Sequence, residues 1–495
     1  MKPSQSLNKP SPLGVEIREV GQVKSVRNFI VEAKGLPSCF NGQILQFEKG
    51  GMGLVMGFKE DSVQILLLKT DVPIRLNDEV HNKGQSLYLP VGEAFLSRVV
   101  SSLCEPVDNL GPIPSKELAY VFRDAPALMD RVPVYETMET GTVMLDALIP
   151  IAKGQRELLL GDRLTGKTTV GIDAILNQKD KGVMCIYCCI GKPHSSLLKL
   201  LRLFQEKEIM PYTIVVSAVA SASVGEQYLA PYTAAMLGEH FMYKGKKVLV
   251  IFDDLTRHAW IYRQISLLLE RPPGREAYPG DIFYIHSQLI ERAAALKPEL
   301  GGGSMTFLPI VEILQGDITG YIPTNLISMT DGQVYFDTSL FYKGFKPAID
   351  FGLSVSRIGS KGQWPAMKEL SGTLRLDYIK YQELLKMTRL KTISLSKEAE
   401  LTLKRGEVIT QLIVQDKNNP VSIEKQVLYL YALKLKVLDE LSSPEIKEFK
   451  EKFPELVQKQ YPEILTEMRK TKVLSSSIKD KLNKALKEYF KKALQ

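Results

Sequence analysis

The chain has 495 residues, of which 44% are hydrophobic and 24% are charged; these fractions are typical of a globular protein, and the length predicts about three domains. No stretch approaches ~18 consecutive apolar residues, so the sequence excludes a transmembrane helix. Much of the lysine behind the net charge of +8 lies after Lys447, interleaved with glutamates at helical spacing, which favours a solvated helix face over a nucleic-acid surface. Composition alone leaves RNA binding open.

The five cysteines are scattered and predict no disulfide framework. Cys185 and Cys188 have the spacing of a metal or redox pair, but they lie in an apolar run, residues 183–190, that is typical of a buried strand. Alternation along a strand puts the two side chains on opposite faces, so we interpret them as packing residues.

The N-terminal part begins with a polar lead-in, residues 1–15, where Pro3, Pro10 and Pro12 prevent a helix and no apolar signal core is present. Residues 16–90 then contain short β-rich runs separated by glycine and Asn-Asp turns. Many short, closely spaced strands predict a small closed β-barrel. The runs are residues 23–26, 42–47, 54–58 and 63–68.

Strand-like and helix-like segments alternate over residues 91–366, which predicts a mostly parallel sheet with helices on its faces. Residues 161–168 read G-x-x-x-x-G-K-T between a short apolar strand, 157–160, and a helix-like segment, 169–176. Strand, glycine-rich turn and helix start form the arrangement of a phosphate-binding loop. The predicted loop consists of Gly161, Asp162, Arg163, Leu164, Thr165, Gly166, Lys167 and Thr168.

This loop predicts a site for ATP or ADP with Mg²⁺. Its glycines allow backbone amides to surround phosphate oxygens at a helix N-terminus. Lys167 is expected to reach the terminal phosphates, and the Thr168 hydroxyl to bind Mg²⁺. A second apolar strand ends at Asp253, which we predict to hold the same Mg²⁺ through water, with Asp254 starting the next helix. The alternative is an ordinary strand followed by a helix-capping aspartate.

From Lys368 onward the pattern is helical, with prolines at turns or helix starts. We expect helices over residues 370–387, 397–414 and 422–441, then two lysine-rich helices, the last from Ser477. The predicted fold class is therefore multidomain α and β: a barrel over residues 16–90, a P-loop nucleotide-binding domain over 91–366 and a helical bundle over 367–495.

Several segments resemble the alpha subunit of F-type (rotary) ATP synthase, and the resemblance extends over roughly residues 16–440. That family has an N-terminal β-barrel, a central RecA-like α/β domain and a C-terminal α-helical bundle, as predicted above. The matching segments are GDRLTGKT (161–168), YLAPYT (228–233), SLLLERPPGREAYPGD (266–281), YIPTN (321–325), TDGQ (330–333) and GLSVSRIGS (352–360).

The resemblance implies a place in a complex. Three such chains are expected to alternate with three beta subunits around a gamma central stalk, with delta and b subunits forming a peripheral stalk. ATP synthesis or hydrolysis is then coupled to a proton (or sodium) gradient. The chain is expected at the cytoplasmic face of a bacterial plasma membrane (or its organelle equivalent), which it reaches only through the ion-translocating sector, and without a nucleic-acid partner.

The resemblance also implies that alpha sites bind Mg-ATP without turnover, and one position supports this independently. A hydrolytic site needs a carboxylate to orient the attacking water, and catalytic relatives have Gly-Glu-Arg just after the next strand. This chain has Gly191-Lys192-Pro193 there. Lysine, with an ordinary pKa near ~10.4, cannot act as that base, so we expect a non-catalytic, regulatory site.

Further residues match family positions. Arg357 matches the arginine that reaches into the neighbouring catalytic site, although a lone loop arginine is more often part of a surface ion pair. Ser354 and Ser328 match positions associated with activity or coupling. The residues that resemble the part closing around adenine are Lys346, Pro347 and Gln415.

Three departures stand out. The family usually has glutamine where Leu164 and Lys192 stand, and we hypothesise that Lys192 contacts a phosphate directly, compensating for the missing amides. The N-terminal helix that docks the peripheral stalk is absent from residues 1–14, so this attachment is expected to differ, to be weaker or to use another surface. The lysine-rich tail is either a solvated helix pair or a contact to acidic lipid headgroups.

Three other functions are alternatives to this one. A hexameric RNA translocase needs stacking aromatics in an N-terminal single-strand-binding domain and a catalytic glutamate, and a homohexameric export ATPase needs that glutamate too. Neither feature is visible. An alpha-like subunit of a rotary ATPase that only hydrolyses ATP and pumps ions stays open, because the difference lies in the partner subunits.

Overall fold

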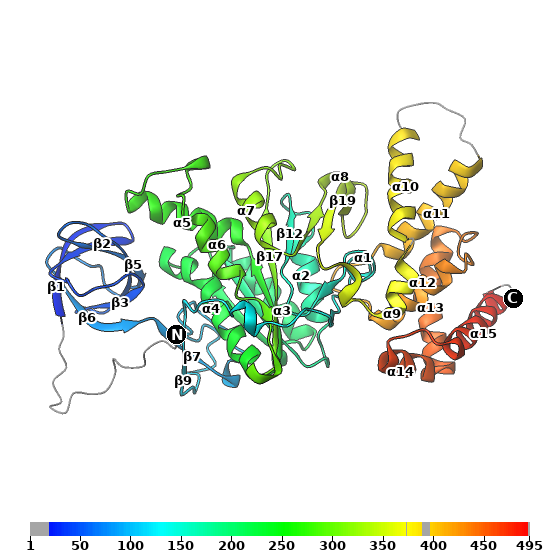
Figure 1. The fold of residues 1–495 in the computed structure, drawn as a ribbon, viewed down its shortest axis with the longest axis horizontal. Coiled ribbons are helices and arrows are strands. Elements are labelled where there is room, and N and C mark those ends of the chain that lie inside the picture. Colours follow the sequence, from blue (N-terminus) through cyan, green and yellow to red (C-terminus); the bar gives the residue numbers. More distant parts are fainter. Residues whose placement is uncertain (1–18, 373, 389–396, 494–495) are drawn as a thin grey trace.

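The structure is a computed structural model that describes residues 19–372, 374–388 and 397–493. Three parts follow one another along the long axis of the molecule: a closed barrel, a central sheet covered by helices, and a helical C-terminal part (Figure 1). This confirms the predicted fold class. The predicted lead-in, residues 1–15, and the segment expected to lack a docking helix lie outside the described residues.

The barrel closes in the strand order β1-β2-β5-β4-β3-β6, with antiparallel neighbours throughout. Alternate side chains point inward, so Val31, Leu45, Val55, Ile65 and Val80 form its core. Because every strand is paired on both sides, the barrel leaves no exposed edge. The strands are β1 (Glu19–Arg27), β2 (Ile30–Lys34), β3 (Gln43–Phe47), β4 (Met52–Phe58), β5 (Val63–Lys69) and β6 (Glu79–Ser86).

The barrel packs against the N-terminus of helix α4 (Val224–Tyr243). The Ser223 hydroxyl, at the start of that helix, donates to the Leu68 carbonyl over 2.7 Å. A Cβ atom added to Gly225 would lie 2.1 Å from the Leu67 carbonyl oxygen, so only glycine allows this close approach. A guanidinium nitrogen of Arg271, in a separate segment of the central part, donates to the Met56 carbonyl of the barrel over 2.7 Å.

The central sheet has the strand order β19-β18-β12-β17-β15-β13-β14-β8, with β16 paired to β17. All neighbours along this order are parallel except β18 and β19, which confirms the predicted mostly parallel sheet. Its strands are β8 (Val99–Val100), β12 (Glu157–Gly161), β13 (Val183–Ile190), β14 (Thr213–Ala218), β15 (Lys247–Asp253), β16 (Ala294–Ala295), β17 (Ser304–Glu312), β18 (Gly332–Phe336) and β19 (Ile349–Ser356). Two small sheets pair β7 (Tyr88–Val91) with β9 (Glu117–Tyr120) and β10 (Thr137–Met138) with β11 (Ile151–Ala152).

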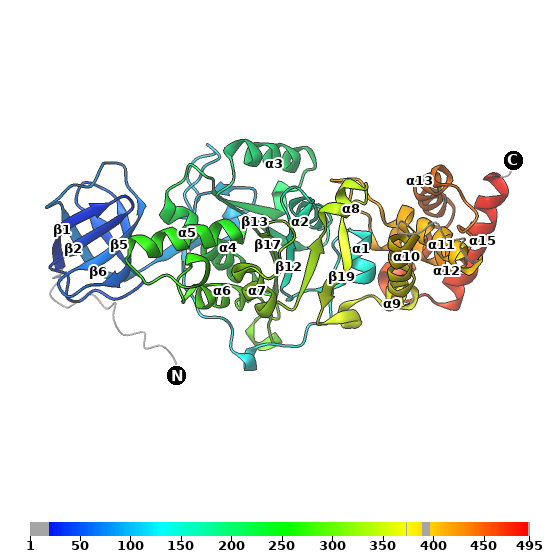
Figure 2. The same ribbon diagram turned by 90° about the horizontal axis from the view of Figure 1, so that it is seen from above.

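Helices cover both faces of this sheet, and Figure 2 shows α3 and α6 on opposite sides of it. Buried Cys185 belongs to the hydrophobic core that packs α2 and α3, and buried Cys188 to the core that packs α4 to α7. The prediction that these cysteines lie on opposite faces and serve packing is therefore confirmed. The helices are α1 (Val143–Leu148), α2 (Lys167–Leu176), α3 (His194–Glu206), α5 (Leu255–Leu268), α6 (Ile282–Ile290), α7 (Tyr321–Met329) and α8 (Thr338–Tyr342).

The C-terminal part differs from the prediction in its helix boundaries. After Leu441 there are three helices rather than two, because Pro462 starts a new helix directly after α13. The predicted helix over 422–441 ends earlier, at Lys434, since Lys436 adopts a left-handed conformation with φ 59°. The predicted helix over 370–387 corresponds to the end of α9, at Ser371, and to α10, which begins at Leu374. The helices are α9 (Pro365–Ser371), α10 (Leu374–Thr388), α11 (Lys397–Ile413), α12 (Ile423–Lys434), α13 (Ser443–Gln460), α14 (Pro462–Thr471) and α15 (Ser476–Ala493).

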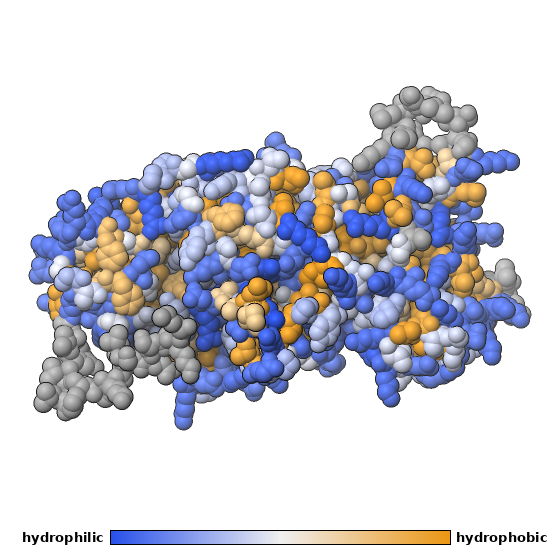
Figure 3. All heavy atoms as spheres, in the orientation of Figure 1, coloured by the Kyte–Doolittle hydropathy of each residue, from blue (hydrophilic) through white to orange (hydrophobic). Residues whose placement is uncertain are grey.

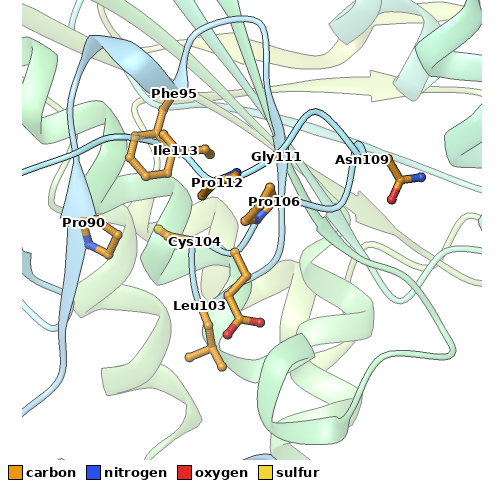
Figure 4. A pocket seen from close by; sticks show the side chains of 10 residues that line it. Pro90, Phe95, Leu103, Cys104, Pro106, Asn109, Gly111, Pro112 and Ile113 are labelled. Carbon is orange, nitrogen blue, oxygen red and sulfur yellow. The ribbon is translucent and has the colours of Figure 1, made fainter.

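On the face drawn in Figure 3, hydrophobic residues form small groups among hydrophilic ones. Figure 4 shows a pocket of about 700 Å³ lined by residues between Pro90 and Ile113, mostly apolar, none of which belongs to the predicted site. Over the part of the chain that the structure describes, no helix combines the length and apolar character needed to cross a membrane.

Candidate nucleotide-binding site

The predicted phosphate loop connects β12, between β17 and β18 in the sheet, to helix α2. A Cβ atom added to Gly161 would lie 2.5 Å from the Phe336 carbonyl oxygen, so this glycine is required by close packing. Gly166 precedes α2 with φ 102°, in the left-handed region that favours glycine. Leu164 also has a positive φ, 64°, and the residue is 82% exposed. The backbone therefore curls back above the strand end, as a phosphate-binding loop requires.

Asp162 supports the shape of the loop from below. Its carboxylate accepts hydrogen bonds from the Gly316 amide, 2.9 Å away, and from the Thr338 hydroxyl, 2.7 Å away. Its carbonyl accepts from the Thr165 hydroxyl over 2.8 Å. Arg163 is largely exposed, with its guanidinium 3.9 Å from the Glu312 carboxylate. Asp162 thus stabilises the shape of the loop through its side chain, and that side chain does not extend into the loop.

Lys167 is the first residue of α2 and is buried. Its ammonium donates to the carbonyls of Gly161, at 2.7 Å, and Asp162. Burial lowers the pKa of Lys167 to about 8, although nearby carboxylates partly oppose this. An anion bound in the loop would favour the charged ammonium, so the site is electrostatically suited to phosphate.

Asp253 lies at the end of β15 and is fully buried. One of its carboxylate oxygens accepts from the Thr168 hydroxyl, 2.9 Å away, and from the Tyr187 hydroxyl, 2.5 Å away. The other forms an ion pair with the Lys192 ammonium, which also lies 3.2 Å from the Thr168 hydroxyl oxygen. The structure thus brings together Thr168, Asp253 and Lys192.

Asp254 has the role that the sequence predicted. Its side chain accepts from the Arg257 amide over 2.9 Å and caps the N-terminus of α5. Burial, together with the neighbouring charge of Asp253, raises the pKa of Asp254 to about 6.

The predicted magnesium site contains suitable atoms but also contains a competing cation. A hydroxyl and a carboxylate are ligands that Mg²⁺ accepts. Here the Lys192 ammonium contacts both groups, so the residues as arranged do not fit a divalent ion between Thr168 and Asp253. Elsewhere within residues 19–372, 374–388 and 397–493, no group of three or more His, Cys, Asp or Glu side chains is placed to hold a metal.

The residues predicted to close around adenine lie together. The Gln415 amide donates to the Lys346 carbonyl over 2.8 Å, and the Gln415 side chain donates to the Gly141 carbonyl, also over 2.8 Å. Pro347 follows Lys346 through a cis peptide bond. The loop after Gln415 reaches α2, where the Asn418 amide hydrogen-bonds to Asp173. Asp173 is six residues after Lys167, roughly 9 Å along the helix axis, so α2 links the phosphate loop to the adenine segment.

The residues assigned to the neighbouring site divide into two groups. Arg357 directly follows β19, and its exposed guanidinium donates to the Ile327 carbonyl, 3.1 Å away, near exposed Ser328 at the end of α7. Ser354, by contrast, is fully buried. Its hydroxyl donates to the Asp350 carbonyl and accepts from the Tyr335 amide, so it joins β19 to β18.

Several residues of the site were not found from the sequence. Thr338 and Gly316 hold Asp162, and Tyr187 holds Asp253, but they lie far away along the chain. Strand alternation puts Tyr187 on the same face as Cys189, but the pairing of Cys189 with Asp253 is a property of the folded sheet that the sequence does not show.

Comparisons with known proteins agree with this geometry. Residues 141–356 match the family described as ATP synthase alpha/beta family, nucleotide-binding domain, and residues 363–489 match the ATP synthase alpha/beta chain, C terminal domain. The ATP synthase subunit alpha of Caldanaerobacter subterraneus subsp. tengcongensis is 44% identical over 97% of this chain and 94% of its own length. Those of Clostridium kluyveri and Helicobacter pylori are each 43% identical over 96% of this chain and 94% and 95% of their own lengths.

Proposed function

Because the chain belongs to the ATP synthase alpha subunit family, we propose that it binds ATP or ADP at a regulatory, non-catalytic site of the synthase head. In this proposal three copies alternate with three beta subunits around the gamma stalk. The head synthesises or hydrolyses ATP in exchange for a proton (or sodium) gradient. The chain lies peripherally at the cytoplasmic face of the membrane, and delta and b subunits attach the head to the membrane sector.

The observation that carries the non-catalytic assignment is the position of Lys192. It stands just after β13, where hydrolytic relatives carry the glutamate that orients water, and its ammonium is paired with Asp253. A cation held against a carboxylate can neither accept a proton from water nor orient it as a base. The site therefore retains phosphate binding through Lys167 and lacks the group that hydrolysis needs.

Arg357 supports the second half of the proposal, the arginine finger. It follows β19, the last strand at one edge of the sheet, and its side chain is exposed. An exposed guanidinium at the edge of a domain can be inserted into a site on an adjacent subunit, where it stabilises charge on the transferring phosphoryl group. Ser328 lies beside it, and buried Ser354 acts by holding β19 in place.

Binding and turnover by the isolated full chain test the non-catalytic assignment. Isothermal titration in Mg²⁺ buffer is expected to give about one ATP per chain, and phosphate release is expected to stay at background because a base is missing. Lys167→Ala should abolish the binding and serves as the control for the site. Sustained phosphate release by the wild type that Lys167→Ala eliminates would contradict the non-catalytic assignment.

A further inference from the structure

Lys192 is held in a defined position at the carboxyl end of the sheet. It is two residues beyond β13 and faces Asp253 at the end of the adjacent strand β15. The Gly191 amide donates to the Ala218 carbonyl over 2.7 Å, and the Ala220 amide donates to the Lys192 carbonyl over 2.9 Å. Gly191 has φ 61° and turns the chain back over the strand ends. The backbone on both sides of the lysine is thus fixed by neighbouring β14 and the loop after it.

The ammonium of Lys192 contacts the two groups predicted to hold Mg²⁺. It pairs with the Asp253 carboxylate and lies 3.2 Å from the Thr168 hydroxyl oxygen. An ammonium group has three N–H donors, so one remains for a third partner. The Lys192 side chain is 19% exposed, whereas that of Asp253 is fully buried. The Lys192 side chain therefore keeps some accessible surface, whereas its carboxylate partner has none.

The remaining contacts of Asp253 also disfavour a divalent ion. Its first carboxylate oxygen already accepts hydrogen bonds from Thr168 and Tyr187, and its second is paired with Lys192. Mg²⁺ requires nearly octahedral oxygen ligands at about 2.0–2.1 Å, so it cannot share this place with an ammonium group. A Mg²⁺ ion at this place would also be repelled by the positive charges of Lys192 and of Lys167, which is buried in the loop above.

We propose that Lys192 takes the place of Mg²⁺ in this site, so that the chain binds free ATP or ADP rather than the magnesium complex. Lys167 and Lys192 together supply the positive charge, and the third N–H of Lys192 donates to a phosphate oxygen. This inference rests on the proposed nucleotide-binding function. It agrees with the hypothesis that Lys192 contacts a phosphate, and it replaces the predicted magnesium at Thr168 and Asp253.

The test compares ATP binding to the isolated full chain in Mg²⁺ and in EDTA, for the wild type, Lys192→Gln and the control Lys199→Gln. Lys199 lies on the exposed face of α3, close in sequence but outside the site. When Mg²⁺ is removed, the wild type and the control are expected to keep the same Kd for ATP within about threefold. The same change should weaken ATP binding to Lys192→Gln at least about tenfold, the value of one charge-assisted hydrogen bond.

A second readout counts metal directly. Each protein is first saturated with ATP in the presence of Mn²⁺, and free ligand is then removed. The wild type should retain almost no Mn²⁺ per nucleotide. Lys192→Gln should retain about one, since Thr168 and Asp253 become available as ligands. A wild type that loses ATP in EDTA, or that retains one Mn²⁺ per nucleotide, overturns the inference. Because both measurements use the wild type, they test the inference even if Lys192→Gln does not fold. Absence of ATP binding in both buffers would instead overturn the proposed nucleotide site itself.

Discussion

The Asp162 carboxylate accepts a hydrogen bond from the Thr338 hydroxyl, 2.7 Å away, and so ties the phosphate loop to the start of helix α8. The same carboxylate holds the Gly316 amide at 2.9 Å. The loop's shape therefore depends on contacts from two distant segments of the chain.

We predict that Asp162→Ala weakens ATP binding without removing any group that faces the phosphates. Two hydrogen bonds worth about 0.5–1.5 kcal/mol each are lost, which corresponds to about a fivefold to hundredfold higher Kd if the loop must be reordered on binding. Asp162→Asn keeps one acceptor oxygen and should lose less, and Thr338→Ser keeps the hydroxyl and should bind normally. Titration calorimetry on the four proteins is the measurement. Equal affinity of Asp162→Ala and the wild type would show that the loop is ordered without this tether.

The phosphate loop and Asp253 could be predicted because their signals are local. Glycines, a lysine and a threonine at fixed spacing, or an apolar strand ending in an acid, are visible within eight residues of sequence. The tethers from Thr338 and Tyr187 could not, since only the order of strands in the sheet brings them to the site. The sequence indicated that Lys192 is charged, but it did not indicate that Lys192 pairs with Asp253.

The fold could be predicted about as far as the site. Short strands and alternating segments indicated a barrel and a parallel sheet, because both patterns repeat within a few residues. The break between α13 and α14 was missed although Pro462 marks it, because a proline permits either a turn or a helix start. The end of α12 follows from the left-handed conformation of Lys436, for which the lysine side chain gives no signal.

Asp173 predicts a specific pH dependence of stability. It is buried in α2, one of its oxygens lacks a hydrogen-bond partner, and burial raises its pKa to about 7. At pH values below about 4 the side chain is protonated whether the chain is folded or unfolded. Between about pH 4 and 7 the unfolded chain releases the proton first, so the folded state loses stability, and above about pH 7 the loss is complete.

Asp173→Asn removes this loss, because an amide does not ionise. We expect its Tm to exceed that of the wild type at pH 8, with the difference shrinking steadily toward pH 4. Thermal unfolding across this range is the measurement, and Asp124→Asn, at an exposed site, is the matched control whose difference from wild type should stay nearly constant. A constant difference for Asp173→Asn as well would mean that Asp173 is ionised in the folded chain.

The buried ion pair between Arg292 and Glu239 is expected to be costly to break from one side only. Both of its hydrogen bonds are 2.7 Å long, both side chains are almost fully buried, and Arg292 also donates to the Val121 carbonyl. Removing one partner leaves a buried charge uncompensated, which typically costs about 3–5 kcal/mol. We predict a loss of this size for Arg292→Met in urea unfolding of the central domain.

The exposed pair of Lys452 and Glu448 provides the comparison. Lys452→Met should cost no more than about 0.5 kcal/mol, because water screens an exposed pair on a helix. The double variant Arg292→Met with Glu239→Leu should recover part of the stability, since both charges are then removed. If Arg292→Met is no worse than Lys452→Met, the buried pair does not stabilise the fold.

The most direct test of the central claim is the ATPase rate of the complex reconstituted with beta and gamma subunits, carrying Arg357 or Arg357→Ala. Lys361→Ala, an exposed cation four residues away, is the control. Our account predicts that Arg357→Ala lowers the rate by about 10³–10⁵-fold, the usual contribution of an arginine finger, while the complex assembles and Lys361→Ala stays near the wild-type rate. A fully assembled Arg357→Ala complex that hydrolyses ATP at the wild-type rate would contradict it.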